Sequence, residues 1–108
     1  MSDFVEQLAE AWNIPVRVRG GLPFIRREDC GRIVEECRAR KVLILGIDAF
    51  RLVGEDTIPE DDLIADFSEL VSKPWDIACL QAARAAESYF GEISPTSVLW
   101  FEFTLRQG

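Results

Sequence analysis

The stretch SVLWFEFTLR, residues 97–106, is the strongest strand signal in the chain. Its apolar positions are Leu99, Phe101, Phe103 and Leu105, and they alternate with Trp100, Glu102, Thr104 and Arg106. A period of two predicts a strand that turns one face to the core and the other face away from it. Trp100 lies on the second face, so it needs separate cover or is exposed.

Three further stretches are typical of strands. The run VLIL at residues 42–45 is apolar throughout and predicts a central strand. Extended character continues from there to a turn at residues 54–56. Residues 14–19 alternate, and Pro15 places them at a sheet edge. Gly20 and Gly21 form a turn, from which residues 22–25 return as a short strand.

Helical patterns cover residues 3–12, 27–40 and 72–90. Ser2 is the expected N-cap of the first helix and Ser72 that of the third, which ends at Gly91. In the second helix one apolar stripe contains Cys30, Ile33, Val34 and Cys37. This spacing makes the two cysteines core residues instead of a metal or redox pair.

The order of these elements is helix, strand or hairpin, helix, strand, a further strand or loop, helix, strand. This order favours an α+β fold, with about three helices packed on a mainly antiparallel sheet in two layers. A length of 108 residues fits one domain, and we see no linker or repeat. We therefore expect a single domain over residues 1–108.

The composition narrows the possible chemistry. The chain has no histidine, so no imidazole can act as a general base or bind a metal. Its three cysteines show no CxxC spacing and suit a reducing compartment. The sequence starts without the features of a secretory signal, and no apolar run is long enough to span a bilayer. These features indicate a cytoplasmic protein, and we expect neither catalysis nor a cofactor.

Charge is concentrated in residues 52–72, the acidic segment, which contains no basic residue. Its acids are Glu55, Asp56, Glu60, Asp61, Asp62, Asp66 and Glu69. The chain has 19 acids and 12 bases, so this segment carries the whole formal charge of −7. Such a field repels nucleic acid and attracts cationic partners. Four apolar residues are expected to cover the core while the acids face water: Leu63, Ile64, Ala65 and Phe67.

Several roles are open to the acidic segment. Asp61, Asp62 and Asp66 could bind Ca²⁺ or Mg²⁺, although the spacing of an EF-hand is missing. The acids could only solubilise the protein, or they could form a surface that binds a basic protein. Carboxylate catalysis is a weaker alternative, because no substrate-positioning motif accompanies the acids.

Arginines gather in the first third of the chain, at Arg17, Arg19, Arg26, Arg27 and Arg32. The net negative charge argues against their binding nucleic acid. We expect them to form a second surface or to pair internally with the acidic segment.

Several segments resemble the bacterial immunity protein 40 family. They are LGIDAF at residues 45–50, Ile58-Pro59, LIADFS at residues 63–68 and AARAAESYF at residues 82–90. The resemblance extends over most of the chain from Trp12 onward. Members of the family accompany polymorphic toxins and neutralise them in the producing cell. The resemblance therefore implies a cytoplasmic antitoxin that binds its cognate toxin.

Nuclease toxins bind anionic substrates, so the expected partner is a basic, nuclease-type toxin. The seven acids of the acidic segment would include the toxin-facing charges. Phe50, Trp75 and Trp100 would be aromatic anchors wherever they are exposed. The alternative is a small, non-catalytic regulatory or structural domain whose acidic face is only solubilising.

Overall fold

The sheet is built around β3 (Val42–Val53), which pairs with β6 (Trp100–Gln107) in the computed structural model of residues 3–108. The pairing is antiparallel and runs from Val42 opposite Gln107 to Phe50 opposite Trp100. A register shift between Ile44 and Gly46 inserts Leu45 as an extra residue in β3. The stretch with the strongest strand signal is therefore a central strand.

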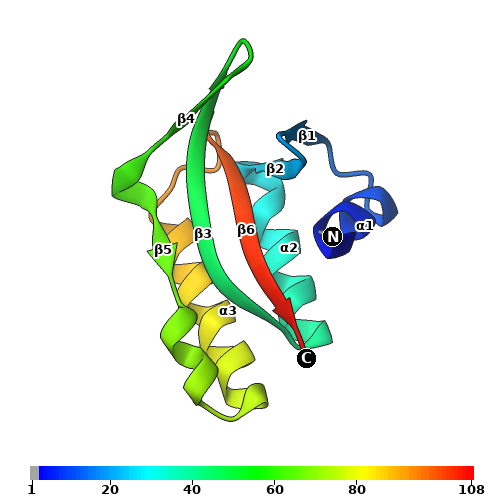
Figure 1. Cartoon of the computed structure of the whole chain (residues 1–108), viewed down its shortest axis with the longest axis vertical. Coiled ribbons are helices and arrows are strands. Elements are labelled where there is room, and N and C mark those ends of the chain that lie inside the picture. The colour runs from blue at the N-terminus through cyan, green and yellow to red at the C-terminus, as the bar shows by residue number, and fades with distance from the viewer. Residues whose placement is uncertain (1–2) are drawn as a thin grey trace.

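Antiparallel hairpins complete the sheet on both sides (Figure 1). The strand order is β1 (Val16–Arg19), β2 (Leu22–Arg26), β6, β3 and β4 (Asp56–Pro59). The short β5 (Ala65–Asp66) pairs with β3 outside this path. Gly20 and Gly21 have φ values of 58° and 79°, which a turn between β1 and β2 requires and which glycine adopts without strain.

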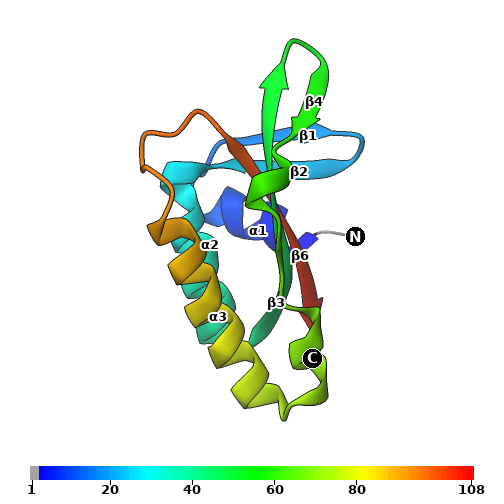
Figure 2. The same cartoon turned by 90° about the vertical axis from the view of Figure 1, so that its left-hand side faces the viewer.

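Two long helices cover one face of this sheet, as Figure 2 shows. They are α2 (Arg27–Arg40) and α3 (Trp75–Gly91), and α1 (Asp3–Ala11) lies beside α2. Two short 3₁₀ turns, η1 (Asp61–Leu63) and η2 (Ser68–Ser72), flank β5. The α+β prediction of two layers is confirmed. Within residues 3–108, no helix is long and apolar enough to cross a membrane.

The core lies between the helices and the sheet. Ala78, Ala82, Ala83 and Ala86 are fully buried, so α3 can approach the strands closely. On the opposing sheet face Phe101 meets Phe90 edge to face, with ring centres 5.2 Å apart. Aromatic pairs in this geometry add to the free energy gained from burial alone.

Both cysteines of α2 are core residues, as their spacing predicts. Cys30 and Cys37 are completely buried, and no disulfide joins the cysteines of residues 3–108. Burial raises the pKa of Cys37 to about 12 and that of Cys30 further still. At neutral pH both are therefore protonated thiols that pack as small apolar side chains.

Several local predictions need correction. Residues 42–53 form one strand, as their extended character predicts, whereas β1 starts only after Pro15 and α3 only at Trp75. Ser72 does not cap α3, because its hydroxyl donates to the carbonyl of Glu69 and thereby closes η2. Ile64 is 55% exposed and does not cover the core. The predicted cap Ser2 lies outside the described residues.

Candidate protein-binding surface

The acidic segment follows one edge of the sheet (Figure 1). It starts in the last two residues of β3, continues through the tip of the β3–β4 hairpin, β4, η1 and β5, and ends in η2. Leu63, Ala65 and Phe67 pack against the core as expected, and Leu70 joins them. The segment is therefore an attached border of the sheet.

Three hydrogen bonds to backbone groups of the acidic segment attach it to β3 and α3. The N–H of Glu60 donates to the carbonyl of Ala49 at 2.8 Å, and the N–H of Phe67 donates to that of the extra residue Leu45 at 2.7 Å. Between them the hydroxyl of Tyr89, on α3, donates to the carbonyl of Leu63. The flanking acids therefore have defined positions, which limits the entropy lost when a partner binds.

A glycine allows β5 to lie close to β3. A Cβ atom added to Gly46 would lie 3.0 Å from the carbonyl oxygen of Ala65, which is tighter than most real contacts. Asp66 pairs with Gly46 in the register, so its side chain lies on the sheet face away from the helices.

Most carboxylates of the acidic segment have no cationic partner. Within residues 3–108, Glu60 is the one member in an ion pair, with Arg51 at 3.0 Å. Asp66 accepts a hydrogen bond from the N–H of Ser68 at 2.9 Å. Hydrogen bonding by the side chain and backbone of Ser68 lowers the pKa of Asp66. The remaining acids are exposed and unpaired: Glu55, Asp56, Asp61, Asp62 and Glu69.

These acids share an edge but do not converge on one point. Glu55 and Asp56 lie at the hairpin tip, Asp61 and Asp62 lie in η1, and Glu69 lies in η2. Among the described residues no group of three or more acids, cysteines or histidines is placed to hold a metal ion. The arrangement fits an extended charged surface better than a cation site.

Two further carboxylates lie on the sheet face away from the helices, and the sequence did not single them out. Asp48 on β3 stands directly opposite Glu102 on β6. Both are half-buried, and like charges in such a pair repel each other. Burial and then the neighbouring charge of Asp48 raise the pKa of Glu102. Only the register of two strands far apart in sequence reveals this pair.

The Asp48–Glu102 pair does not form a catalytic cleft. Asp48 lines a hollow of about 370 Å³ together with Asp66 and Thr104. Glu102 lines a different groove, between α1 and β6. Two carboxylates that act on one substrate must flank the same bond, so this arrangement does not favour glycosidase-like chemistry.

Replacing Glu102 with glutamine is expected to stabilise the protein at neutral pH. The folded state raises the pKa of this carboxyl above its ordinary value of 4.5, so it disfavours the charged form. The penalty is complete above the raised pKa and disappears below pH 4.5, where both states are protonated. The melting temperature of Glu102→Gln should therefore be higher than that of the wild type at pH 7, and the two should approach each other below pH 4.5. An equal gain at both pH values would contradict the electrostatic cause.

Of the two roles expected for the arginine cluster, a second surface or pairing with the acidic segment, the structure contradicts the pairing. Arg26 pairs with Glu28 and Asp29, and Arg32 pairs with Glu35, all within or beside α2. Arg27 donates to the carbonyls of Phe90 and Ile93 at the C-terminal end of α3. Its positive charge there also interacts favourably with the negative end of the helix dipole.

The other two arginines of this group lie on β1. Arg17 lies 4.9 Å from the ring centre of Trp100. One terminal nitrogen of Arg19 is buried and has no hydrogen-bond partner among the described residues. The acidic segment is thus left without internal neutralisation by this cluster.

The three candidate aromatic anchors are each partly covered. Phe50 meets Phe24 edge to face at 5.1 Å, and Trp100 lies under Arg17. The indole N–H of Trp75 donates to the carbonyl of Lys41 at 3.0 Å. None of the three is a fully exposed anchor.

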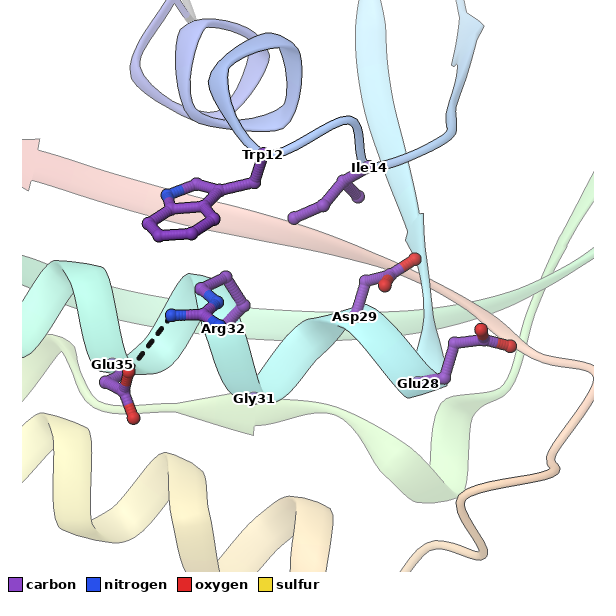
Figure 3. A pocket seen from close by; sticks show the side chains of 7 residues that line it. All are labelled: Trp12, Ile14, Glu28, Asp29, Gly31, Arg32 and Glu35. Carbon is purple, nitrogen blue, oxygen red and sulfur yellow. Dashed lines mark hydrogen bonds and ion pairs between the residues drawn. The ribbon is translucent and has the colours of Figure 1, made fainter.

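The exposed tryptophan is Trp12, which the sequence placed on the apolar face of the first helix. The helix ends at Ala11, so Trp12 leaves that face and is 46% exposed. The guanidinium of Arg32 lies 4.1 Å from its ring centre and also bonds Glu35 (Figure 3). These residues line a polar hollow of about 400 Å³ on the α1–α2 side of the molecule. This aromatic–arginine pair is separate from the acidic segment, which borders the opposite edge of the sheet.

Comparisons with known proteins add no relative: no family model matches the chain, and no curated protein or solved structure does so.

Proposed function

We propose that this protein is an immunity protein, which binds a cognate bacterial toxin and neutralises it in the cytoplasm of the producing cell. One observation carries the binding role: a row of unpaired carboxylates is held in place along one edge of the sheet. The proposal that the partner is a toxin rests on the resemblance of residues 45–50, 58–59, 63–68 and 82–90 to the immunity protein 40 family.

Electrostatics explain how such an edge would inhibit a nuclease. A nuclease holds its anionic substrate with basic residues, so its substrate-binding surface attracts a carboxylate-rich protein. Attraction speeds the encounter, and the bound acidic segment then competes with the nucleic acid for the same cations. Because hydrogen bonds already hold the backbone at Leu63 and Phe67, the acidic segment loses little conformational entropy on binding.

A second reading treats the protein as a small regulatory or structural domain with a solubilising acidic face. A purely solubilising surface needs charge but no fixed geometry. The hydrogen bonds from Tyr89 and Phe67 that attach the acidic segment to the sheet favour the binding role. Nucleic acid is not the expected partner on either reading, because the exposed charge is negative.

Co-expression with the product of the large reading frame beside this gene, which the proposal predicts to be a toxin, tests the proposal. We expect the protein to restore growth of cells that produce the toxin, and to form a complex with an inactivated form of that toxin. Binding is measured with the two purified proteins. Growth rescue without binding would then point to lowered expression of the toxin instead of neutralisation. Absence of both protection and binding would reject the function.

A further inference from the structure

The second edge of β6 is open over most of its length. β3 pairs with β6 from Trp100 to Gln107, whereas β2 reaches it only at Trp100 and Phe101. Within residues 3–108 no strand pairs this edge from Glu102 onward. The β1–β2 hairpin turns away from β6 at this point, and α1 lies to the same side (Figures 1 and 2). Backbone groups along an open edge are ready to pair with another strand.

An apolar groove accompanies the open edge. It has a volume of about 380 Å³ and lies between α1, the start of β2 and β6. Phe4 and Val5 form one wall, and Phe103 and Leu105 lie on the opposite side. Leu22, at the end of the groove, is 47% exposed. A strand added to β6 would cover part of this apolar surface.

We propose that the protein forms a symmetric homodimer in which β6 pairs antiparallel with β6 of a second copy, with the two-fold axis at Thr104. In this register Glu102 stands opposite Arg106 of the second copy, and Arg106 opposite its Glu102. Phe103 stands opposite Leu105 of the second copy on the helix-covered face. A two-fold interface must be self-complementary, and the spacing of these residues around Thr104 meets that condition.

The charges within one chain support a second copy as the occupant. Neither Asp48 nor Glu102 forms an ion pair in the described chain, and Arg106 has no acidic partner there. A second copy supplies the cation next to Glu102 and the anion next to Arg106. Opposite charges directly across two strands stabilise the pairing.

Strand β2 limits where a second copy can pair with β6. Because Ile25 already occupies the edge at Phe101, an incoming strand can pair only from Glu102 onward. The same limit applies in the second copy, and a two-fold axis at Thr104 satisfies it while placing Glu102 opposite Arg106 within the shared stretch of residues 102–106. Residues 107 and 108 have to leave the pairing.

The dimer is compatible with partner binding but does not depend on it. The acidic segment borders the β4 and β5 side of the sheet, beyond β3, and the open edge of β6 faces the other side. Both acidic segments would remain free, and the two negative edges would lie far apart. A short strand pairing with a modest groove is typical of a weak interface.

Sedimentation equilibrium of the protein alone, from about 10 µM to about 1 mM, tests the dimer. Wild type is expected to associate reversibly to a dimer. Glu102→Arg and Arg106→Glu should each weaken the dimer about tenfold or more, since each turns two attractive pairs into two repulsive ones. An equal mixture of these two variants should form a heterodimer, and the double variant should dimerise again.

Charge-matched controls complete the design. Arg84→Glu and Glu92→Arg change exposed residues on and just after α3 that form no ion pair in residues 3–108, and they should leave the dimer unchanged. Melting curves check that every variant folds. The proposal fails if wild type stays monomeric throughout, if the controls weaken the dimer equally, or if the mixture forms no heterodimer. The toxin is absent from these measurements, so their outcome is independent of the proposed function.

Discussion

Phe101→Ala is expected to lower the free energy of unfolding by about 3–5 kcal/mol, the usual cost of removing a buried phenylalanine. Phe101 is completely shielded from solvent. Its ring meets Phe90 and Tyr89 of α3 edge to face, at 5.2 and 6.3 Å between ring centres. Its backbone pairs with Ala49 on β3 and Ile25 on β2. The substitution therefore leaves a cavity where the helices and the sheet meet.

A loss of this size is a large part of the about 5–15 kcal/mol that stabilises a typical domain. Phe101→Ala should unfold at a lower urea concentration than the wild type, and its melting temperature should be lower by more than about 10 °C. Thr104→Ala, on the same strand but exposed, is the matched control and should cost less than about 1 kcal/mol. Equal costs for the two variants would contradict the packing of β6 against α3.

The sequence allowed the elements of this fold to be predicted where one face is plainly apolar. The alternation of residues 99–105 marked β6, and the stripe from Cys30 to Cys37 marked α2 with its bounds. Prediction failed where a short element ends within a pattern. Trp12 continues the apolar spacing of α1 but lies one residue beyond it, so its ring points away from the core.

Pairing between distant strands could not be predicted from periodicity. Alternation assigns Asp48 and Glu102 to a face of their own strands, but only the register of β3 on β6 places them opposite each other. The seven acids of the candidate surface were apparent as a charge run. Their attachment by Tyr89 and Leu45 required the fold, because both partners lie outside the acidic segment.

Reversal of two charges in η1 is the decisive test of the acidic segment as a binding surface. The double variant Asp61→Lys/Asp62→Lys is expected to slow association with the proposed toxin partner about tenfold or more at low ionic strength, because steering depends on the local field. Both side chains are exposed and form no ion pair within residues 3–108, so the fold should be unaffected. Asp66 is left intact, because it accepts the backbone hydrogen bond of Ser68.

Net charge has to be separated from the local field. Glu10→Lys/Glu92→Lys changes the net charge by the same amount, at exposed acids outside the acidic segment. This control should slow association far less than the η1 variant, because a charge acts mainly within the Debye length of about 10 Å at 0.1 M salt. Equal slowing by the two variants would assign the effect to net charge alone.

Salt dependence gives the second criterion. At about 1 M salt the Debye length falls to about 3 Å, and electrostatic steering is then largely lost. The association rates of wild type and Asp61→Lys/Asp62→Lys, measured by stopped flow, should therefore converge as salt is raised, and the slope for the variant should be shallower. A difference that persists unchanged at high salt would mean that η1 acts through direct contacts. Identical rates and slopes at every salt concentration would mean that the toxin does not use this edge, and the acidic segment would then be left with a solubilising role.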